Sequence, residues 1–326
     1  MECIPFSLDR LNDVCQLWNR ELGHDFPMRC ELFKQNTILD KTLFRNGSWI
    51  TVDRENKVTG VIISKMWHEG DLNVDFGRGT GWIQVLVVDS NYRNSGVGTT
   101  LLRKAENAFK QKEISKIVLG KDPWHFFPGI PDEYGSVKKW FERRGYAYIH
   151  RVYDMYRYYS VGEPCRLSRR RGVRFFLMGK SDKGKLLAFL NKCFPGRWEY
   201  EAIQYFERGG TGREYVIFEI NGEIKGFCRI NDSRSPFIAP NTYWAPLFDS
   251  ELGGIGPLGV DPELRGRGYG TALVQAGIYF LRKRGIQHVV IDWTDLREFY
   301  GKLGYRVWKS YGQYEKDLLT TDETVH

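Results

Sequence analysis

Two short glycine-rich segments each place arginine and glycine directly before an apolar, helix-like stretch. The first is RNSGVG, residues 93–98, and the second is RGRGYG, residues 265–270. The first N–H groups of a helix have no intrahelical partner and lie at the positive end of the helix dipole, so such a corner attracts phosphate. Glycine lets an anion approach the backbone, and arginine adds charge-assisted hydrogen bonds. The shared spacing R-x-x-G-x-G therefore predicts two phosphate-binding corners.

Each corner supplies a run of seven candidate ligands. In the first corner they are Arg93, Asn94, Ser95, Gly96, Val97, Gly98 and Thr99, and in the second they are Arg265, Gly266, Arg267, Gly268, Tyr269, Gly270 and Thr271. Neither corner ends in the G-K-[ST] of a P-loop or has the three glycines of a dinucleotide fingerprint. One such match can be a solvated surface turn, but two in equivalent contexts favour a binding function.

The segments around the corners repeat in the same order. HDFPMRCELF corresponds to KCFPGRWEYE, and WITVDRENKVTGVIISKMW corresponds to YVIFEINGEIKGFCRIND. The offsets between partners drift along the chain, which indicates duplication with insertions. We expect domains at residues 1–158 and 173–326. They are joined by a linker at 159–172, where Gly, Pro, Ser and Arg interrupt the helical and strand periodicities.

Both halves have the same predicted order of elements. A short strand precedes a helix, a hairpin, an apolar strand, the glycine corner, a helix, a strand, a short helix and a final strand pair. The expected ranges are helices 8–22, 98–112, 183–193 and 270–284, strands 83–88, 117–119, 255–260 and 288–292, and hairpin turns at Glu55-Asn56 and Asn221-Gly222. This order predicts an α+β fold with a mixed sheet and helices packed against it.

Composition narrows the class of protein. The 326 residues suffice for two cores, and 42% hydrophobic with 27% charged content is ordinary for a globular chain. No segment approaches the roughly 20 apolar residues of a membrane span, and the start of the chain has no signal-peptide pattern, so we expect a cytoplasmic protein. The net charge of +8 suggests an anionic partner, which could be nucleic acid, a membrane surface or a phosphorylated cofactor.

The cysteines and one basic run do not indicate a binding site. The six cysteines are scattered without metal-binding spacing, so we expect reduced thiols and no metal site. The basic run at residues 166–174 is more typical of a solvated linker than of a docking patch.

At this point the chain resembles the GNAT superfamily of acyl-CoA-dependent N-acetyltransferases. VDSNYRNSGVGTTLL and VDPELRGRGYGTALV match the family's [QR]-x-x-G-x-[GA] pyrophosphate turn, and FYGKLGY resembles its short helix and closing strand, with a looser likeness in WFERRGY. The resemblance covers nearly the whole chain as two tandem domains, an arrangement similar to that of mycothiol synthase. It implies two mixed, mostly antiparallel sheets flanked by helices, and acetyl-CoA (acyl-CoA) as the cofactor.

The resemblance also assigns roles to individual positions. Backbone groups of Leu258, Gly259 and Val260, with Leu86, Val87 and Val88 in the first half, would hold the thioester carbonyl and pantetheine. Tyr300 would donate a proton to the departing thiolate, because a phenol with a pKa of about 10 is protonated at neutral pH. Tyr300 could instead only pack its helix on the sheet. Phe141 aligns with Tyr300 and cannot donate, so the second half is the better catalytic candidate.

The sequence does not decide which residue is the general base. Glu251 would precede the fourth strand of the second half, and Asp292 would lie on the fifth, yet each could be a solvated or salt-bridged carboxylate. Trp293 and Asp295 would lie near the pantetheine arm.

The first half carries an insert, GKDPWHFFPGIPDEYGSVKK, that could cover an acceptor pocket. Its candidates for proton transfer are His125, Asp132, Glu133 and Tyr134. Aromatic packing at a domain interface would explain the same composition.

The resemblance implies transfer of an acetyl group to a primary amine of a small molecule by direct attack. The acceptor could be an amino sugar, an aminoglycoside, a polyamine or an amino acid. The alternatives are a non-enzymatic acyl-CoA sensor and a protein N-acetyltransferase, whereas Fem-type aminoacyltransferases generally lack the intact turn. We expect a monomer or homodimer with no nucleic-acid or membrane partner, since no recognised motif accompanies the basic charge.

Overall fold

The computed structural model describes residues 1–68, 74, 76–168 and 172–318, and these form two compact units. The first unit takes the described residues of Met1–Asn73, Gly77–Val152 and Lys309–His326, and the second those of Val74–Phe76 and Tyr153–Trp308. Part of the basic run, residues 169–171, lies outside the described residues. The units therefore differ from the domains expected at 1–158 and 173–326, since the last described segment of the chain belongs to the first unit.

The first unit builds its sheet mainly from the N-terminal half of the chain. Its elements are β1 (Glu2–Pro5), α1 (Leu11–Leu22), α2 (Cys30–Asn36), β2 (Trp49–Val52), β3 (Val58–Met66), β4 (Thr80–Val88), α3 (Val97–Lys110), β5 (Lys116–Leu119), β6 (Ile130–Pro131) and α4 (Gly135–Glu142). The strand order is β1-β2-β3-β4-β5-β13, with only β4 and β5 parallel among these described pairs. The short β6 pairs with β13 (Arg306–Asp317).

The second unit repeats this design. Its elements are β7 (Ala147–Tyr158), β8 (Val173–Leu177), α5 (Lys183–Cys193), α6 (Arg197–Glu207), β9 (Tyr215–Ile220), β10 (Glu223–Asn231), β11 (Leu252–Val260), α7 (Tyr269–Lys283), β12 (His288–Thr294) and α8 (Arg297–Gly301). The strand order is β8-β9-β10-β11-β12-β7, and only β11 and β12 are parallel among these described pairs. The expected fold of mixed, mostly antiparallel sheets flanked by helices is confirmed.

The closing strands cross from one unit to the other. The last part of β7 pairs with β12, from Tyr158 opposite His288 to Met155 opposite Ile291, and so completes the second sheet. The last part of β13 pairs with β5, with Glu315 opposite Val118, and so completes the first sheet. Each half thus ends in one strand of 12 residues rather than the expected strand pair.

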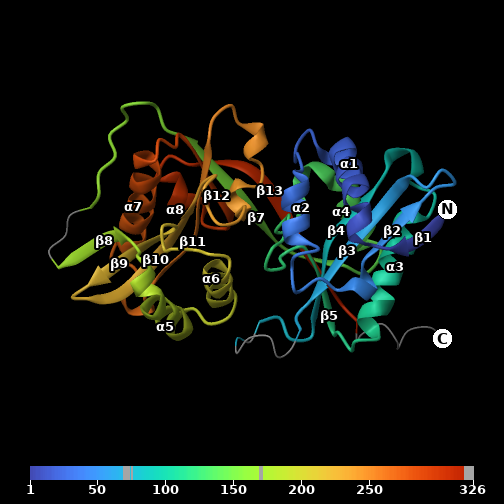
Figure 1. Cartoon of the computed structure of the whole chain (residues 1–326), viewed down its shortest axis with the longest axis horizontal. Helices are drawn as coiled ribbons and strands as arrows, with labels where there is room; N and C mark the ends of the chain where they lie inside the picture. The colour runs from blue at the N-terminus through green and yellow to red at the C-terminus, as the bar shows by residue number, and fades with distance from the viewer. Residues whose placement is uncertain (69–73, 75, 169–171, 319–326) are drawn as a thin grey trace. The chain divides into compact units, whose positions relative to one another are not determined.

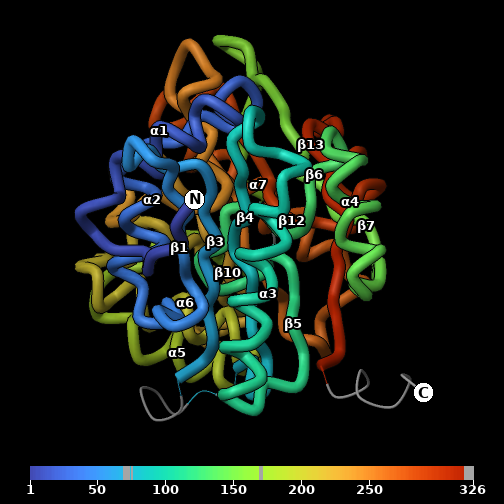
Figure 2. The backbone as a smooth tube through the Cα atoms, turned by 90° about the vertical axis from the view of Figure 1, so that its right-hand side faces the viewer, coloured from blue at the N-terminus to red at the C-terminus, as the bar shows by residue number. Residues whose placement is uncertain are grey.

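Amphipathic helices cover the sheets and form the cores. In α3 the buried side chains recur at helical spacing, as at Leu101, Ala105 and Phe109, and pack with Ile117 of β5. Figure 2 shows α3 running beside the strands of the first unit. In the second unit α7 packs on the sheet through residues such as Leu273 and Leu281 (Figure 1).

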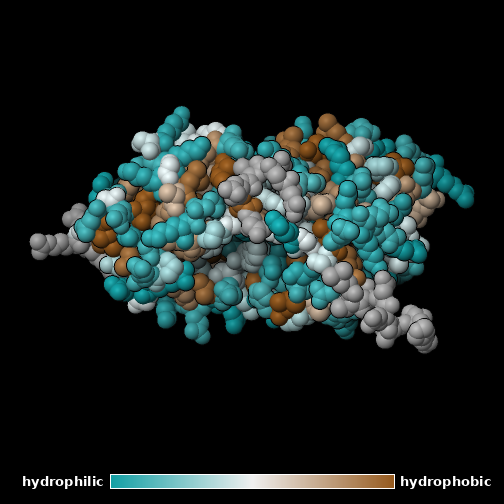
Figure 3. Space-filling model, turned by 90° about the horizontal axis from the view of Figure 1, so that it is seen from below, coloured by the Kyte–Doolittle hydropathy of each residue, from teal (hydrophilic) through white to brown (hydrophobic). Residues whose placement is uncertain are grey.

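The face of the molecule drawn in Figure 3 is mostly polar. Hydrophilic residues dominate it, and the apolar residues there form separate patches. Across the described ranges, no helix has the length and apolar character required to span a bilayer. The six cysteines are free thiols, and the described residues contain no cluster of three or more His, Cys, Asp or Glu side chains suited to a metal ion.

Candidate functional site

The two parallel strands of each sheet separate after a short paired region. In the second unit β11 and β12 pair from Leu252 opposite His288 to Ile255 opposite Ile291, and β11 then continues to Val260 without a described partner on that side. In the first unit the last pair of β4 and β5 is Ile83 with Leu119. The neighbouring antiparallel pairs have an irregular register at the same point. This separation leaves backbone groups available at Leu258, Gly259 and Val260, and likewise at Leu86, Val87 and Val88.

Both glycine corners adopt the same unusual backbone conformation. Positive φ angles occur at Asn94 (61°) and Gly96 (90°) in the first corner, and at Gly266 (75°) and Gly268 (77°) in the second. Gly96 and Gly268 are the N-cap residues of α3 and α7. Successive N–H groups in such an alternating turn form a concave anion site.

The open side of each corner fits a bound pyrophosphate. A Cβ atom added to Gly96 or Gly266 would meet no atom within 4 Å, so these α-carbons face open space. The first-turn amides of the following helices, including those of Val97–Thr99 and Tyr269–Thr271, have no intrahelical acceptor. Both corners therefore present open backbone amides, and the binding of an acyl-CoA diphosphate there stays a prediction.

The arginines of the two corners have different partners. Arg93 forms an ion pair with Glu21 of α1, and its Nε donates to the carbonyl of Val88 at 3.2 Å. Arg265 has no carboxylate partner among the described residues, and its guanidinium lies 5.9 Å from the ring centroid of Phe194. The second corner therefore keeps more positive charge for a phosphate ligand.

Tyr300 and Phe141 occupy matching positions in the two units. Tyr300 on α8 is buried and makes edge contacts with Phe299 and Tyr305, at centroid distances of 4.9 and 6.3 Å. Phe141 on α4 makes the same contacts with the residue before it and with Tyr146, at 4.9 and 5.1 Å. The hydroxyl of Tyr300 has no hydrogen-bond partner in the described part of the chain, and burial raises its pKa. Tyr300 thus has a protonated phenol where the first unit has a plain ring.

Asp292 lies where β11 and β12 separate. A Cβ atom on Gly256 would be 3.3 Å from Asp292 Oδ1, and Gly256 has φ of 135°, so only glycine suits this contact. The Nδ2 of Asn241 donates to Asp292 Oδ1 at 3.0 Å, and Asn231 Nδ2 donates to Asn241 Oδ1 at 3.0 Å. Burial, followed by the nearby Asp154 carboxylate, raises the pKa of Asp292 to about 7. This value suits a general base at neutral pH.

Asp154 also shapes the end of β12. Its Oδ1 accepts a hydrogen bond from the backbone N–H of Trp293 at 3.0 Å, and Trp293 has a positive φ of 42°. The guanidinium of Arg197 lies 4.5 Å from the centroid of the Trp293 ring. Asp295 follows as an exposed residue. Asp154, Asn231 and Asn241 had no sequence signal, because they lie in other segments and only the fold brings them to Asp292.

Glu251 lies at the other end of β11. It directly precedes Leu252, where β11 and β12 are still paired. Its Oε1 accepts a hydrogen bond from the backbone N–H of Ser233 at 3.1 Å and another from the Ser233 hydroxyl. The geometry therefore favours Asp292 over Glu251 as the base.

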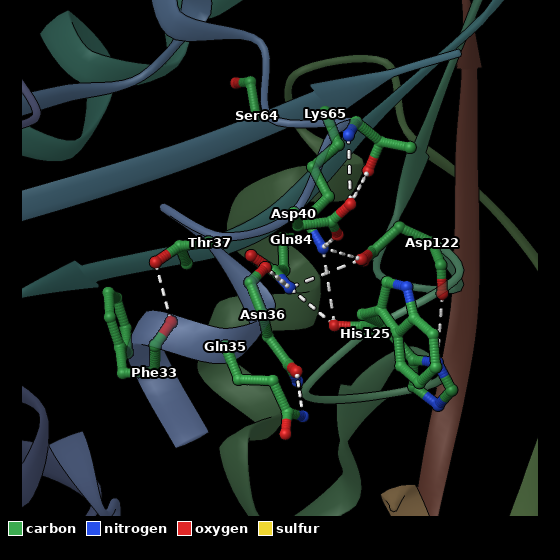
Figure 4. A network of polar contacts seen from close by, with 12 residues as sticks. Phe33, Gln35, Asn36, Thr37, Asp40, Ser64, Lys65, Gln84, Asp122 and His125 are labelled. Atoms are coloured by element: carbon green, nitrogen blue, oxygen red, sulfur yellow. Dashed lines mark hydrogen bonds and ion pairs between the residues drawn. The ribbon is translucent and has the colours of Figure 1, made fainter. Parts of the chain in front are cut away.

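In the first unit an ion-pair network fills the corresponding region (Figure 4). The Nζ of the fully buried Lys65 lies 2.6 Å from Asp40 Oδ2 and 2.6 Å from Asp122 Oδ2. The Nε2 of Gln84, at the irregular point of β4, donates to the carbonyl of Trp124 at 2.7 Å. A lysine thus compensates the carboxylates here, whereas Asp292 is hydrogen-bonded to an amide and faces further carboxylates.

The insert of the first unit packs into its core. Phe127 stacks on Trp18 at 5.5 Å, and Phe126 stacks on Phe33 at 5.3 Å. His125 is buried with its Nδ1 at 3.1 Å from the Asp122 carbonyl oxygen. The insert is therefore part of the hydrophobic core of this unit, which differs from the expected loop over an acceptor pocket.

The polar residues of the insert that were candidates for proton transfer belong to its packed structure. Asp132 forms ion pairs with Lys138 and with Arg151, the latter at 3.0 Å. Burial raises the pKa of Tyr134 to about 12. Glu133 belongs to the same short turn.

A sheet that opens between two parallel strands, followed by an anion-binding helix corner, defines an acyl-CoA-dependent acyltransferase fold. The chain belongs to the Acetyltransferase (GNAT) family, which it matches over residues 11–127 and 184–305. The two matched regions confirm the tandem repeat, and the family uses acyl-CoA.

Individual relatives resemble different lengths of the chain. An uncharacterized N-acetyltransferase of Methanocaldococcus jannaschii is 30% identical over 134 residues, 39% of this chain and 57% of its own length. A mycothiol acetyltransferase of Gordonia bronchialis is 29% identical over 76% of this chain and 79% of its own length. A solved fungal GH3 β-N-acetylglucosaminidase contains a region described as a GCN5-related glucosamine N-acetyltransferase. It matches 96% of this chain and 38% of its own, with a TM-score of 0.85 and 23% identity, and this likeness concerns the fold.

Replacement of Lys65 by methionine tests whether the network of the first unit is structural. Loss of the ammonium leaves the carboxylates of Asp40 and Asp122 buried without compensation, so we expect a loss of about 3–5 kcal/mol in the free energy of unfolding. Differential scanning calorimetry measures this change. Acetyl transfer per folded molecule should change less than about 2-fold; a larger drop would place Lys65 in the chemistry.

Valine at Gly268 and at Gly96 forms a matched pair of variants. Both positions have left-handed φ, so each valine costs about 1–2 kcal/mol of conformational energy. We expect Gly268→Val to raise the Kd for CoA about 10-fold or more, because the side chain disturbs the turn amides. Gly96→Val is the control for backbone strain, because it leaves the CoA site at the second corner unchanged. Calorimetric titration with CoA distinguishes the two, and an unchanged Kd in Gly268→Val would contradict the assignment.

Proposed function

We propose that the second unit catalyses acetyl transfer from acetyl-CoA to a primary amine of a small molecule. The observation that carries this proposal is Asp292, a carboxylate with a pKa of about 7 at the point where β11 and β12 separate. The corresponding region of the first unit holds the Lys65 ion pairs and a phenylalanine in place of Tyr300. We therefore assign a structural or cofactor-binding role to the first unit.

Acyl-CoA binding is assigned to two groups of backbone atoms. The amides of the second corner, residues 265–271, would hold the pyrophosphate, with added charge from Arg265 and Arg267. Backbone groups of Leu258–Val260 would align the pantetheine and polarise the thioester carbonyl, since this edge of β11 lies beyond its last pair with β12. Bound acetyl-CoA would supply the acetyl group as an activated thioester.

Asp292 would make the amine nucleophilic. A primary amine is protonated at neutral pH and cannot attack until it loses a proton. The ionised carboxylate accepts that proton, and the amide of Asn241 holds the carboxylate in place. Burial, and after it the nearby Asp154 carboxylate, keeps the pKa of Asp292 high enough for this step.

Tyr300 would complete the proton balance. As the amine nitrogen bonds to the carbonyl carbon and the carbon–sulfur bond breaks, the departing sulfur gains negative charge. The buried phenol is fully protonated at neutral pH and can donate to that sulfur. The nitrogen loses its second proton as the amide forms, and this proton returns to the phenolate. Asp292 releases the proton that it took from the amine to solvent.

The names of the relatives guide the choice of acceptors. One relative is a mycothiol acetyltransferase, and the fungal region is described as a glucosamine N-acetyltransferase. Amino sugars therefore come first in an acceptor panel, followed by aminoglycosides, polyamines, amino acids and peptide N-termini. Release of free thiol from acetyl-CoA measures turnover. A sensor would retain the nucleotide without turnover, and exclusive reaction with peptides would favour a protein N-acetyltransferase.

Asparagine at position 292 removes the base while preserving the shape. For the wild type we expect kcat/KM to rise with pH through about 7, because Asp292 must be ionised. Asp292→Asn should lower kcat/KM by about 10²–10⁴-fold and remove this limb of the profile. Glu251→Gln tests the alternative base; if it alone abolished activity, Glu251 would take the role.

The same substitution has a predictable effect on stability. The folded-state pKa of about 7 lies above the unfolded value near 3.9, so the folded protein binds the extra proton between these values. Stability is therefore lost as pH rises toward 7 and is fully present below the unfolded pKa. Asp292→Asn should unfold at a higher temperature than the wild type at pH 8, and thermal denaturation at pH 5 and pH 8 measures the difference.

Phenylalanine at position 300 removes only the proton donor. We expect Tyr300→Phe to lower kcat about 10²-fold or more, while the Kd for CoA changes less than about 2-fold. Tyr305→Phe is the matched control, since this neighbouring tyrosine is equally buried. Equal kcat values in the two variants would show that Tyr300 only packs its helix.

A further inference from the structure

Arg229 of β10 is a buried cation that forms no ion pair among the described residues. It is 2% exposed, and its Nε and Nη2 atoms are buried without a hydrogen-bond acceptor anywhere in the described ranges. Two nearby arginines behave differently, since Arg213 and Arg284 both form ion pairs with Asp232, at 2.6 and 2.9 Å. Burial of an unpaired guanidinium is costly, so a chain that keeps one at this depth needs an anion to offset it.

Aromatic rings give Arg229 only partial compensation. Its guanidinium lies 4.5 Å from the centroid of Phe237 and 5.7 Å from that of Tyr205 on α6. Cation–π contacts stabilise a guanidinium less than charge-assisted hydrogen bonds do together with charge neutralisation. The rings also hold the planar group in a fixed orientation. Its donors are thus preorganised for an anionic oxygen group.

Arg229 lies next to the candidate catalytic region. The register of β10 and β11 shifts between Cys228 and Ile230, so Arg229 is at the irregular point that faces Gly256–Pro257. Asp292 approaches the same segment from β12. Asn231, two residues beyond Arg229 on the same face of β10, connects through Asn241 to Asp292. The backbones of β10 and β12 are two strand spacings apart, roughly 10 Å.

We propose that the acceptor is an amine that also carries a carboxylate or phosphate group, and that Arg229 binds this anionic group while the amine reaches Asp292. The unpaired Nε and Nη2 donors form a fork that suits two oxygens of one anion. The Oδ1 of Asn231 is likewise buried without a donor among the described residues, and it accepts a hydrogen bond from the acceptor between the two charges. This specificity rests on the proposed acetyltransferase function.

Matched acceptors test the charge requirement directly. Glucosamine 6-phosphate is compared with glucosamine, and L-lysine with cadaverine, which lacks the carboxylate. For the wild type we expect kcat/KM to be at least about 10-fold higher for the charged member of one pair. The pair that shows the preference identifies the anion as phosphate or carboxylate. Equal values within both pairs would overturn the inference and leave the acetyltransferase function intact.

Methionine at position 229 keeps the length of the side chain and removes its charge. In Arg229→Met the preference for the charged acceptor should fall below about 2-fold, with kcat/KM for the neutral member unchanged. Arg208→Met is the matched control, because Arg208 also lies over the Phe237 ring, at 5.3 Å, and is partly exposed. A retained preference in Arg229→Met would contradict the assignment.

Two readouts do not depend on turnover. The first is calorimetric titration with glucosamine 6-phosphate and with L-lysine. The protein is saturated with CoA, so that the glycine corner is already filled. We expect the wild type to bind the charged acceptor and Arg229→Met to bind it at least about 10-fold more weakly. Arg229→Met should also unfold at an equal or higher temperature, since a buried unpaired charge is lost. If no amine were acetylated, the proposed function would fail, but this titration would still decide whether Arg229 binds the anion. Unweakened binding in Arg229→Met, or none in the wild type, would overturn the inference.

Discussion

The candidate site depends on the point where the parallel strands β11 and β12 separate. After Ile255 and Ile291, β11 and β12 no longer share hydrogen bonds, and the backbone of β11 becomes available on one side. A backbone edge in this position must find other partners, because buried N–H and C=O groups are costly when unpaired. Glycine at position 256 then lets Asp292 approach the opening. The proposed cofactor alignment, proton transfer and acceptor recognition would all use this one interruption of the sheet.

The two units accommodate buried carboxylates in different ways. In the first unit, a lysine between two aspartates offsets part of their buried negative charge, and aromatic side chains of the insert pack into the core of the same unit. In the second unit, Asp292 and Asp154 lie close together, and the pKa of Asp292 rises instead. A buried ion pair gives a stable, chemically inert structure, whereas a carboxylate with a raised pKa keeps a mobile proton at a cost in stability. The two copies therefore accommodate buried carboxylates differently, and the second is the copy that we propose to be reactive.

Local patterns predicted the elements and the corners well. The turn at Asn221-Gly222 and the boundaries of α5 follow from turn chemistry and helical periodicity, which act over a few residues. The partner of a closing strand depends on distant segments, so periodicity alone does not identify the sheet that β13 completes. The same limit applies to the candidate site. Tyr300 and Asp292 were recognisable beside known motifs, whereas Arg229 differs from an ordinary paired arginine only in what surrounds it after folding.

The crossing of β7 and β13 links the folding of the two units to the order of protein synthesis. β5 pairs with the last part of β13, and Tyr314 and Leu318 complete the core of the first unit. A ribosome makes these residues almost 200 positions after β5, when nearly all of the second unit has already emerged. The first unit therefore keeps an open sheet edge until β13 has been made, and separation of the chain at its linker would give two incomplete sheets rather than two independent domains.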